Sequence, residues 1–176
     1  MEKPVVIECF NEDWAGEYKR EEGLIKGVLA ETAIAIEHIG STSVPGLGAK
    51  PIIDTMAGVR HLDAADRFIE PLSQLGYEHV YHADFPNRRF FRKGQWRAGT
   101  HHLHIYTYGS EEWNNQLLFR DYLIAHPDVR EQYNQLKLAL ADAHRNDRTS
   151  YTNAKHPFIT DVIRRAQAEK APAKGG

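Results

Sequence analysis

The chain has 176 residues, a formal net charge of −2, and 41% hydrophobic and 26% charged residues. This length and composition are typical of one folded domain with its own core. A charge so close to zero argues against a general attraction to nucleic acid or to anionic membranes. No apolar run approaches the roughly 18 residues that a membrane-spanning helix needs.

The single cysteine, Cys9, has no partner for an internal disulfide, which fits a reducing compartment. We interpret Cys9 as a small apolar residue of the first predicted strand. The initial Met-Glu-Lys-Pro lacks the basic and apolar pattern of a signal peptide. We therefore expect a cytoplasmic protein, bacterial in style.

Strands and helices are predicted to alternate over the first part of the chain. A strand at residues 5–10 precedes a helix that Asn11 or Asp13 caps and whose apolar residues reach Val28. Apolar, β-branched residues predict a buried strand at 33–39. A loop rich in Gly, Ser and Pro occupies 40–50, and a further strand spans 51–59.

An amphipathic helix is predicted at residues 63–75, where Gly76 ends it. A strand at 77–82 follows, then a turn at 84–87. Two strands at 88–93 and 101–107 are joined through residues 94–99. The order of strands and helices therefore predicts a mixed β-sheet with flanking helices, which is an α/β (α+β) fold.

The last third of the chain is predicted to be helical. Ser110 begins one helix, and His126-Pro127-Asp128 separates it from a second. Asp147 begins a third stretch, kinked or restarted at Pro157. Residues 1–170 then form one domain, and residues 171–176 form a disordered tail.

The most informative stretch runs from residue 36 to residue 54. Gly40 lets the backbone approach a phosphate closely, and the hydroxyls of Ser41, Thr42 and Ser43 can donate hydrogen bonds to it. Asp54, on the next strand, is placed to hold a divalent metal ion against the same phosphates. The simpler alternative is a tight loop with a capping serine and an aspartate satisfied by the backbone.

The length of this pattern makes the simpler alternative less attractive, because the stretch closely resembles the GrpB family. The resemblance extends from about Glu8 to Ile163 and includes further motifs. These are Glu37 to Leu47, Ala49 to Asp54, Thr100 to His104, Leu118 to Leu123 with His126-Pro127, Tyr133 with Leu136-Lys137, and Tyr151 with Lys155 and Phe158-Ile159. Family members also occur fused to dephospho-CoA kinase. The family looks like a branch of the nucleotidyltransferase superfold, so the resemblance implies that fold.

In that superfold, a Gly-Ser pair is followed by a strand that carries Asp-x-Asp, and the two carboxylates bind two Mg²⁺ ions. This sequence matches the pattern with Gly40-Ser41 and Asp54, but has Met56 in place of the second aspartate. A thioether is a poor ligand for a hard cation. Two-metal nucleotidyl transfer would therefore need another acid in its place.

Histidines offer a second set of metal ligands. His102 and His104 lie two apart on a predicted strand and share a face, whereas His101 points the other way. With Asp54 they could form a two-histidine, one-carboxylate site for Mg²⁺, Mn²⁺ or Zn²⁺, and the donor set suits a transition metal best. The alternative is one buried, hydrogen-bonded histidine and exposed neighbours.

Glu37 and His38 are candidate catalytic acid–base residues, although strand alternation allows just one of them to face the same side as Asp54. Candidate phosphate contacts are Lys50, Lys155, Arg89 and Arg92. The two arginines belong to a basic cluster that consists of Arg88, Arg89, Arg92, Lys93 and Arg97. A solvated hairpin and surface lysines are the alternatives.

The resemblance and these residues predict transfer of a nucleotidyl group from a nucleoside triphosphate to a small acceptor, with a divalent metal as cofactor. The expected partner is a nucleotide or another small phosphorylated molecule, not a membrane or nucleic acid. A non-catalytic nucleotide-binding module is the first alternative, because of Met56. A metal-dependent hydrolase using Asp54, His102 and His104 is the second.

Overall fold

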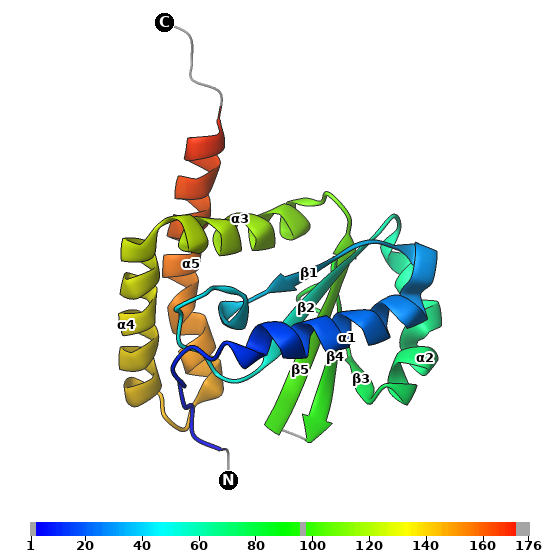
Figure 1. The fold of residues 1–176 in the computed structure, drawn as a ribbon, viewed down its shortest axis with the longest axis horizontal. Helices are drawn as coiled ribbons and strands as arrows, with labels where there is room; N and C mark the ends of the chain where they lie inside the picture. Colours follow the sequence, from blue (N-terminus) through cyan, green and yellow to red (C-terminus); the bar gives the residue numbers. More distant parts are fainter. Residues whose placement is uncertain (1–2, 96–97, 172–176) are drawn as a thin grey trace, which may run out of the picture.

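A five-stranded mixed sheet lies at the centre of the protein (Figure 1). The structure is a computed structural model that describes residues 3–95 and 98–171. The strands lie in the order β1-β2-β5-β4-β3, with β2 and β5 parallel and the other pairs antiparallel. Their bounds are β1 Ala33–Ile39, β2 Ile53–Val59, β3 Tyr77–Val80, β4 Arg89–Gln95 and β5 Ala98–Thr107.

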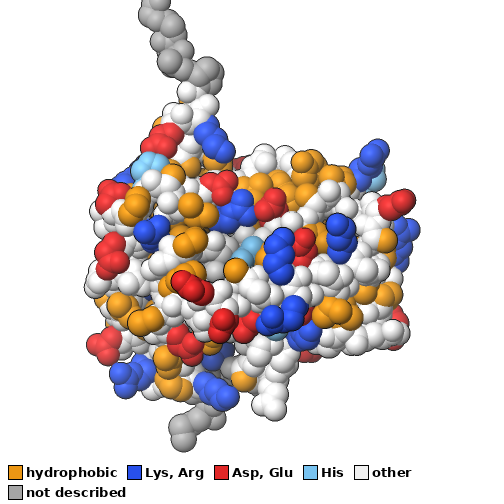
Figure 2. Space-filling model, in the orientation of Figure 1, with side chains coloured by type: hydrophobic (Ala, Val, Ile, Leu, Met, Phe, Trp, Pro, Cys, Tyr) orange, Lys and Arg blue, Asp and Glu red, His pale blue; other side chains and the backbone are white. Residues whose placement is uncertain are grey.

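Helices cover both faces of the sheet. The longer ones are α1 Asp13–Leu29, α3 Glu111–Ala125, α4 Pro127–Ala143 and α5 Arg148–Lys170, and the short ones are η1 Ala30–Thr32, η2 Ser41–Ser43, η3 Leu62–Phe68 and α2 Ile69–Gln74. In Figure 1, α1 crosses the sheet, α2 lies beside β3, and α4 and α5 stand together at the other end of the molecule. Positive and negative side chains are interspersed over the face in Figure 2, in keeping with the small net charge.

One face of the sheet is apolar and carries the main core. Because side chains alternate along β2 and β5, one side of the sheet carries Ala57, Val59, Leu103 and Ile105. Each of these four side chains is 0% exposed. They pack against α1, η3 and α2 in a cluster with Ile25, Leu29, Ala65, Leu72, Tyr77 and Phe91.

The opposite face carries the polar residues singled out by the sequence. Asp54 is paired in register with His102, and Met56 with His104, so all four side chains project to this side. Helix α3 covers part of it, because Trp113 packs in a separate cluster with Ile39, Met56 and Tyr106. The predicted sharing of one face by His102 and His104, and its division from His101, is therefore confirmed.

Most predicted elements are present within a residue or two. The strand predicted at 33–39 has the bounds of β1, Ser110 caps α3 by accepting a hydrogen bond from the Trp113 amide, and Pro127 opens α4. Helix α5 runs without interruption through Pro157. No helix within the described ranges combines the length and apolar character of a membrane span. Of the predicted tail, residues 172–176 lie outside the described residues.

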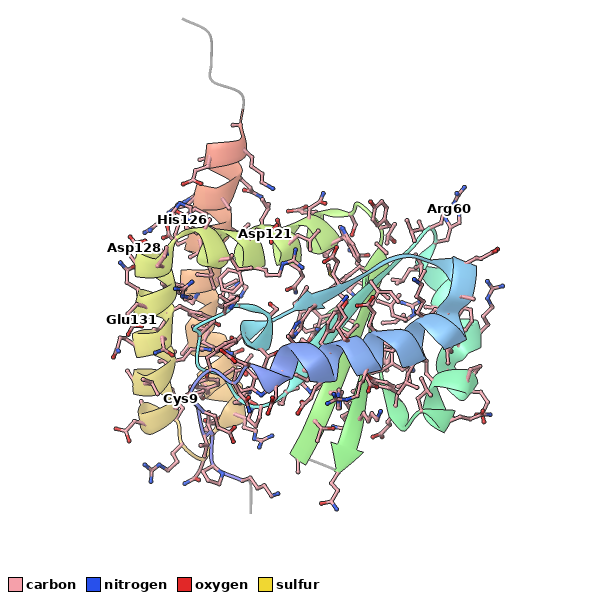
Figure 3. The ribbon with its side chains drawn as sticks, in the orientation of Figure 1. Cys9, Arg60, Asp121, His126, Asp128 and Glu131 are labelled. Carbon is pink, nitrogen blue, oxygen red and sulfur yellow. The ribbon has the colours of Figure 1, made fainter. Side chains whose placement is uncertain are left out.

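Two predicted elements are wrong in detail. Residues 5–10 form no strand, because they lie beside a loop and make a single bridge, Glu8 to Ala49; Cys9 is exposed there and is not a core residue (Figure 3). The helix predicted at 63–75 is a 3₁₀ segment, η3, followed by the short α2. Pro71, near the start of α2, has no amide hydrogen for the helical bond to the preceding turn.

A buried carboxylate ties α1 to the sheet. Glu21 is 4% exposed, accepts a hydrogen bond of 2.8 Å from the Tyr77 hydroxyl, and forms an ion pair of 2.9 Å with Lys93. His101 lies 3.7 Å away on the same side. Since α1, β3, β4 and β5 each contribute a group, this network fixes the helix against the apolar face.

Replacing Glu21 with glutamine removes the charge that Lys93 faces, so Glu21→Gln is expected to lower the free energy of unfolding by about 2 kcal/mol. Denaturant unfolding followed by circular dichroism would measure this. The control Asp142→Asn removes an exposed ion pair, in which the Asp142 side chain is 84% exposed and that of Arg145 is 68% exposed. This variant should leave the unfolding midpoint unchanged. Equal stability of Glu21→Gln and the wild type would contradict this account.

Candidate functional site

A cavity of about 410 Å³ opens on the polar face of the sheet. Its floor contains the loop after β1, the start of β2 and the middle of β5, and its walls come from α3, α4 and α5. The sequence-predicted residues that line it are Gly40, Ser41, Thr42, Lys50, Asp54, His102, His104 and Lys155. Segments far apart in the chain therefore meet at one site.

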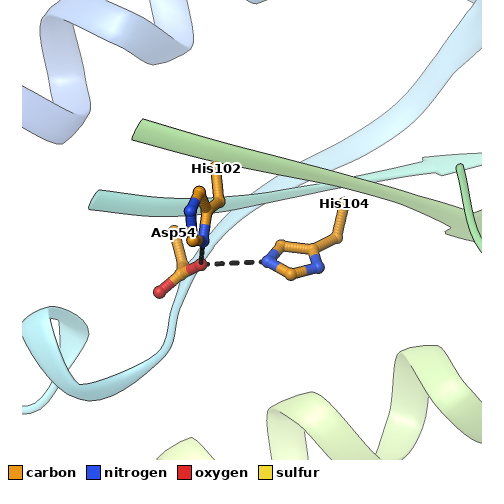
Figure 4. A group of neighbouring side chains, drawn as sticks. All are labelled: Asp54, His102 and His104. Atoms are coloured by element: carbon orange, nitrogen blue, oxygen red, sulfur yellow. Dashed lines mark hydrogen bonds and ion pairs between the residues drawn. The ribbon is translucent and has the colours of Figure 1, made fainter. Parts of the chain in front are cut away.

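Asp54, His102 and His104 converge at the floor of the cavity (Figure 4). Oδ1 of Asp54 lies 2.9 Å from Nε2 of His104 and 3.3 Å from Nδ1 of His102. The three potential ligand atoms lie within 4.8 Å of one another. In the described part of the chain this is the sole group of three or more His, Cys, Asp or Glu residues with that geometry.

The electrostatics of this trio suit a cation. Burial pushes the pKa of Asp54 upward, but its hydrogen bonds to the two histidines prevail and hold the pKa below the ordinary value of 3.8. Burial lowers the pKa of His104, against the pull of Asp54. Nδ1 of His104 is buried and makes no hydrogen bond to any described residue. An ionised carboxylate beside two imidazole rings is a donor set that suits Zn²⁺ or Mn²⁺.

A second metal ion does not fit the same way. Met56 is 0% exposed and packs against Ile39, Tyr106 and Trp113. Its thioether therefore belongs to the core, and Asp54 is the one carboxylate of the trio. The residues present fit a single divalent ion, not the pair that an Asp-x-Asp strand would hold.

Gly40 brings the loop against Asp54. Its φ of +74° lies in the left-handed region, and a Cβ atom at this position would lie 2.6 Å from Oδ2 of Asp54. Any larger residue would push the carboxylate away from the histidines. The need for glycine is thus both conformational and steric.

The three hydroxyls of the loop have different partners. Oγ of Ser41 accepts a hydrogen bond of 2.9 Å from Nζ of Lys137 and lines the cavity. Oγ1 of Thr42 lies 3.0 Å from Nε2 of His38. The Ser43 hydroxyl donates to the carbonyl of Gly40, and Ser43 does not line the cavity. Ser41 is therefore the hydroxyl best placed for a ligand.

Three lysines surround the upper part of the cavity. Lys137 is 1% exposed and donates to Ser41 and to the carbonyl of Gly48. Its Nζ also lies 4.8 Å from the ring centre of Tyr133, while Lys50 and Lys155 lie 5.2 Å and 4.6 Å from that of Tyr151.

No carboxylate within residues 3–95 and 98–171 forms an ion pair with any of these three lysines. Burial and the neighbouring lysines lower the pKa of Lys137 to about 7. Burial and Lys50 likewise lower the pKa of Lys155 to about 8. A bound anion would stabilise the protonated form of both lysines, and no carboxylate of the described residues is ion-paired with either, which is the condition of an anion site.

The two proposed acid–base residues lie outside this cavity. Glu37 projects from the same face as Asp54, but its carboxylate is bound by Arg120 at 2.8 Å. His38 projects to the opposite face, where its ring stacks on Tyr18 with centroids 4.5 Å apart. Burial lowers the pKa of His38 to about 4. Strand alternation thus separates the pair, as the sequence predicted.

The basic cluster also lies away from the cavity. Arg89 pairs with Asp66 at 2.7 Å and Asp63 at 3.4 Å, on the apolar face, and Arg92 pairs with Glu78 at 3.2 Å. Arg97 lies outside the described residues. Their acidic partners are 14 to 26 residues distant in the chain, so the sequence did not reveal these pairs.

Lys137 is the main residue of the cavity to which the sequence analysis assigned no role, although it belongs to one of the motifs that carry the family resemblance. It follows Val129 and Tyr133 at helical spacing and belongs with them to the buried side of α4. A lysine in the buried stripe of an amphipathic helix was the available signal, since buried lysines usually have a partner or a function.

The arrangement of strands and helices places the protein in a known fold class. This structure matches that of the Cid1 poly(U) polymerase with a TM-score of 0.56 and a sequence identity of 14%. The match covers 84% of this chain and 49% of the polymerase chain. A cytoplasmic RNA terminal U-transferase matches with a TM-score of 0.52 at 17% identity, over 77% and 42%. The fold is therefore nucleotidyltransferase-like.

Within this class the chain belongs to the GrpB family. The model of that family, described as GrpB protein, matches residues 4–165. The crystal structure of GrpB from Enterococcus faecalis has a TM-score of 0.87 and 34% identity, covering 93% of this chain and 98% of that one. The glutamate-rich protein GrpB of Alkalihalophilus pseudofirmus is 34% identical over 163 residues, which are 90% of this chain and 94% of that protein.

Other relatives are longer than this chain. The protein YqkA of Bacillus subtilis is 38% identical over 168 residues, covering 96% of this chain but 49% of YqkA. A dephospho-CoA kinase of Mycolicibacterium paratuberculosis is 29% identical over 187 residues, covering 93% of this chain and 46% of the kinase. The chain thus spans about half the length of these two relatives, and the match to a dephospho-CoA kinase agrees with the expected fusion.

If the trio holds a metal ion, His104→Ala should abolish stoichiometric binding of Zn²⁺ or Mn²⁺, because it removes one of three ligands. Isothermal titration of the metal-free protein would measure binding directly. His101→Ala is the matched control, since His101 lies on the same strand but faces Glu21. Equal metal affinity in wild type and His104→Ala would exclude the trio as the site.

Proposed function

We propose that this protein is a metal-dependent nucleotidyltransferase that binds a nucleoside triphosphate in the cavity and transfers its nucleotidyl group to a small acceptor. One observation carries the proposal: three lysines without carboxylate partners face the same cavity as the Asp54, His102 and His104 trio. A polyphosphate would balance the lysines, and its α-phosphate would reach towards the trio.

The lysines and the loop would act on the polyphosphate. Lys50, Lys137 and Lys155 would neutralise the charge on the leaving pyrophosphate, and Ser41 would orient it by a hydrogen bond. An acceptor hydroxyl oxygen bonds to the α-phosphorus while the bond to the bridging oxygen of the β-phosphate breaks. Pyrophosphate leaves, and the hydroxyl proton passes to water.

Asp54, His102 and His104 would hold the metal ion. When bound, such an ion supplies Lewis-acid polarisation of the phosphoryl oxygens. Before the ion binds, Asp54 is already ionised, because its hydrogen bonds to both histidines keep its pKa low. Gly40 would keep that carboxylate in place through its close approach.

A non-catalytic nucleotide-binding role is the second candidate, and the burial of Met56 favours it. The cavity would then bind the triphosphate through the same lysines, but lack the second carboxylate that most transferases of this fold use. Binding without turnover would distinguish this role from the first.

Nucleoside triphosphates with Mg²⁺, Mn²⁺ or Zn²⁺ are expected to raise the thermal unfolding midpoint by about 5–10 °C at a concentration 100-fold above Kd. Lys137→Met should remove most of this rise, because it deletes a buried positive charge. Asp54→Asn should remove the metal-dependent part. The control Lys19→Met alters a lysine that is 73% exposed on α1 and should leave the rise intact.

The outcomes separate the candidates. A rise with pyrophosphate release in the presence of an acceptor supports transfer, and a rise without release for any acceptor favours the binding module. No rise with ATP, GTP, CTP or UTP would contradict both. A fall in midpoint on adding EDTA, with no nucleotide effect, would instead support a metal-dependent hydrolase built on the trio.

Polyphosphate binding should weaken as pH rises from 7 to 9. The pKa values of Lys137 and Lys155 are lowered to about 7 and about 8, so both lysines lose their protons across this range. A bound polyanion requires the charged forms, so binding takes up protons and the affinity falls by up to about tenfold per pH unit for each proton. Isothermal titration with tripolyphosphate in EDTA would measure the dependence.

Folding stability should move in the opposite direction. Because the folded-state pKa of Lys137 lies below the ordinary 10.5, the unfolded chain binds more protons between these values, and stability rises with pH in that window. Lys137→Met should reduce both the pH dependence of tripolyphosphate affinity and the pH dependence of the free energy of unfolding. A tripolyphosphate affinity that is constant from pH 7 to 9 would show that these lysines do not bind the anion.

A further inference from the structure

A second cavity of about 350 Å³ adjoins the first and has no role in the function proposed above. Asn115 and Gln116, on α3, line both cavities and form the wall between them. Tyr106 lines the second cavity, and its ring lies parallel to that of His104 with centroids 6.3 Å apart. The second cavity therefore begins directly beside the trio.

The strand order places this cavity on the far side of the trio from the loop. Asp54 lies on β2, His102 and His104 lie on β5, and Arg88 immediately precedes β4, the next strand across the sheet. The loop with Ser41 lies at the opposite side, after β1. In a phosphoryl transfer the attacking and leaving oxygens are roughly in line across the phosphorus. If the lysines hold the leaving pyrophosphate, the acceptor must approach from the side of this second cavity.

The wall of the second cavity is held in place by the protein itself. Nδ2 of Asn87 donates a hydrogen bond of 2.9 Å to Oε1 of Glu112, which ties the turn before β4 to the first turn of α3. The guanidinium of Arg88 lies over the rings of Phe85 and Phe90, at 4.6 Å and 4.8 Å from their centres. These contacts hold the turn and Arg88 without a ligand.

One unused hydrogen-bonding group belongs to a residue of this cavity. Nε of Arg88 is buried, and within the described residues it has no hydrogen-bond partner. Buried polar atoms without partners are rare, so a ligand group that accepts from Nε of Arg88 would satisfy this atom. A hydroxyl group can accept this hydrogen bond.

The charge of the second cavity differs from that of the first. It contains no lysine, and its charged residues are Asp84, Glu112 and Arg88. The remaining polar residues are Tyr106, with its hydroxyl, and the amides Asn87, Asn115 and Gln116. A phosphorylated acceptor would meet two carboxylates here, whereas hydroxyl and amine groups would find acceptors and donors at every side.

We propose that the second cavity is the acceptor site and that it takes a small polyhydroxyl compound, neutral or amine-bearing, and not a phosphorylated one. The inference rests on the proposed transfer for the direction of approach, but the binding of such a compound can be tested without any nucleotide. The volume of about 350 Å³ is enough for a molecule of monosaccharide size.

Three probes share one scaffold and differ in one group: glucose, glucosamine and glucose 6-phosphate. Ligand-observed NMR titrations of the metal-free protein would measure their affinities at pH 7. Glucosamine and glucose should bind, glucosamine more tightly, and glucose 6-phosphate should bind at least about tenfold more weakly than glucose at this cavity. Gln116→Leu and Arg88→Met should each weaken glucose binding by about tenfold, because each removes hydrogen-bond donors.

Two further variants separate this site from the polyphosphate site. Glu112→Gln keeps an acceptor for Asn87 but removes the charge, so it should abolish the preference for glucosamine and retain glucose binding. Lys137→Met should leave the affinities for glucose and glucosamine unchanged, and should remove any binding of glucose 6-phosphate at the polyphosphate site. Gln116→Leu and Arg88→Met are both included because either alone could disturb the packing of α3 or of the turn, and the thermal midpoint of each reports on this.

Several results would overturn the proposal: no binding by any of the three probes, tighter binding by glucose 6-phosphate than by glucose in Lys137→Met, or loss of glucose binding in Lys137→Met with retention in Gln116→Leu. The two proposals fail separately. Glucose binding that depends on Gln116, in a protein that binds no nucleotide, would retain this cavity as a polyhydroxyl site and reject the transferase.

Discussion

The approach of the Gly40 backbone to the Asp54 carboxylate determines the geometry of the whole site. A Cβ atom at Gly40 would lie 2.6 Å from Oδ2, so the loop can press against the carboxylate because the residue is glycine. That contact brings the Ser41 hydroxyl to the same cavity as the trio, and Ser41 in turn accepts a hydrogen bond from Lys137 of α4. The sheet, the loop and the C-terminal helices are thus joined through one close contact.

The division of the sheet into two faces separates folding from the site. On the apolar face, Glu21 is buried but has Lys93 and Tyr77 as partners, so its charge is balanced within the protein. On the other face, Lys137 is equally buried and donates to neutral oxygens alone among the described residues. A buried charge costs free energy unless it is paired. The desolvation free energy of the unpaired lysines is therefore not offset within the protein, and a bound anion would offset it.

Local sequence patterns predicted the elements and the floor of the site, but not its walls. The β-branched run gave the bounds of β1, and period-two alternation placed His102 and His104 on one face. Residues 5–10 have a similar apolar pattern, yet no sheet edge lies beside them and they form no strand. Lys137 lies 83 positions after Asp54, and its approach to Ser41 depends on how α4 packs, which no local pattern contains. The acidic partners of Arg89 and Arg92 come close only after folding, so local sequence alone leaves both arginines as candidate phosphate contacts.

The lysines also bear on the absence of the second carboxylate. In a two-metal site the second ion neutralises the β- and γ-phosphates and the leaving oxygen. Under the proposed function, Lys50, Lys137 and Lys155 lie where that ion would act, and up to three positive charges exceed the two that a divalent ion supplies. Stabilisation of the phosphates would then not need a carboxylate at position 56, because a second carboxylate beside Asp54 would weaken the field of these lysines on the phosphates. Met56 instead adds apolar packing beneath the trio, which lowers the local dielectric and strengthens each remaining charge interaction at the cavity.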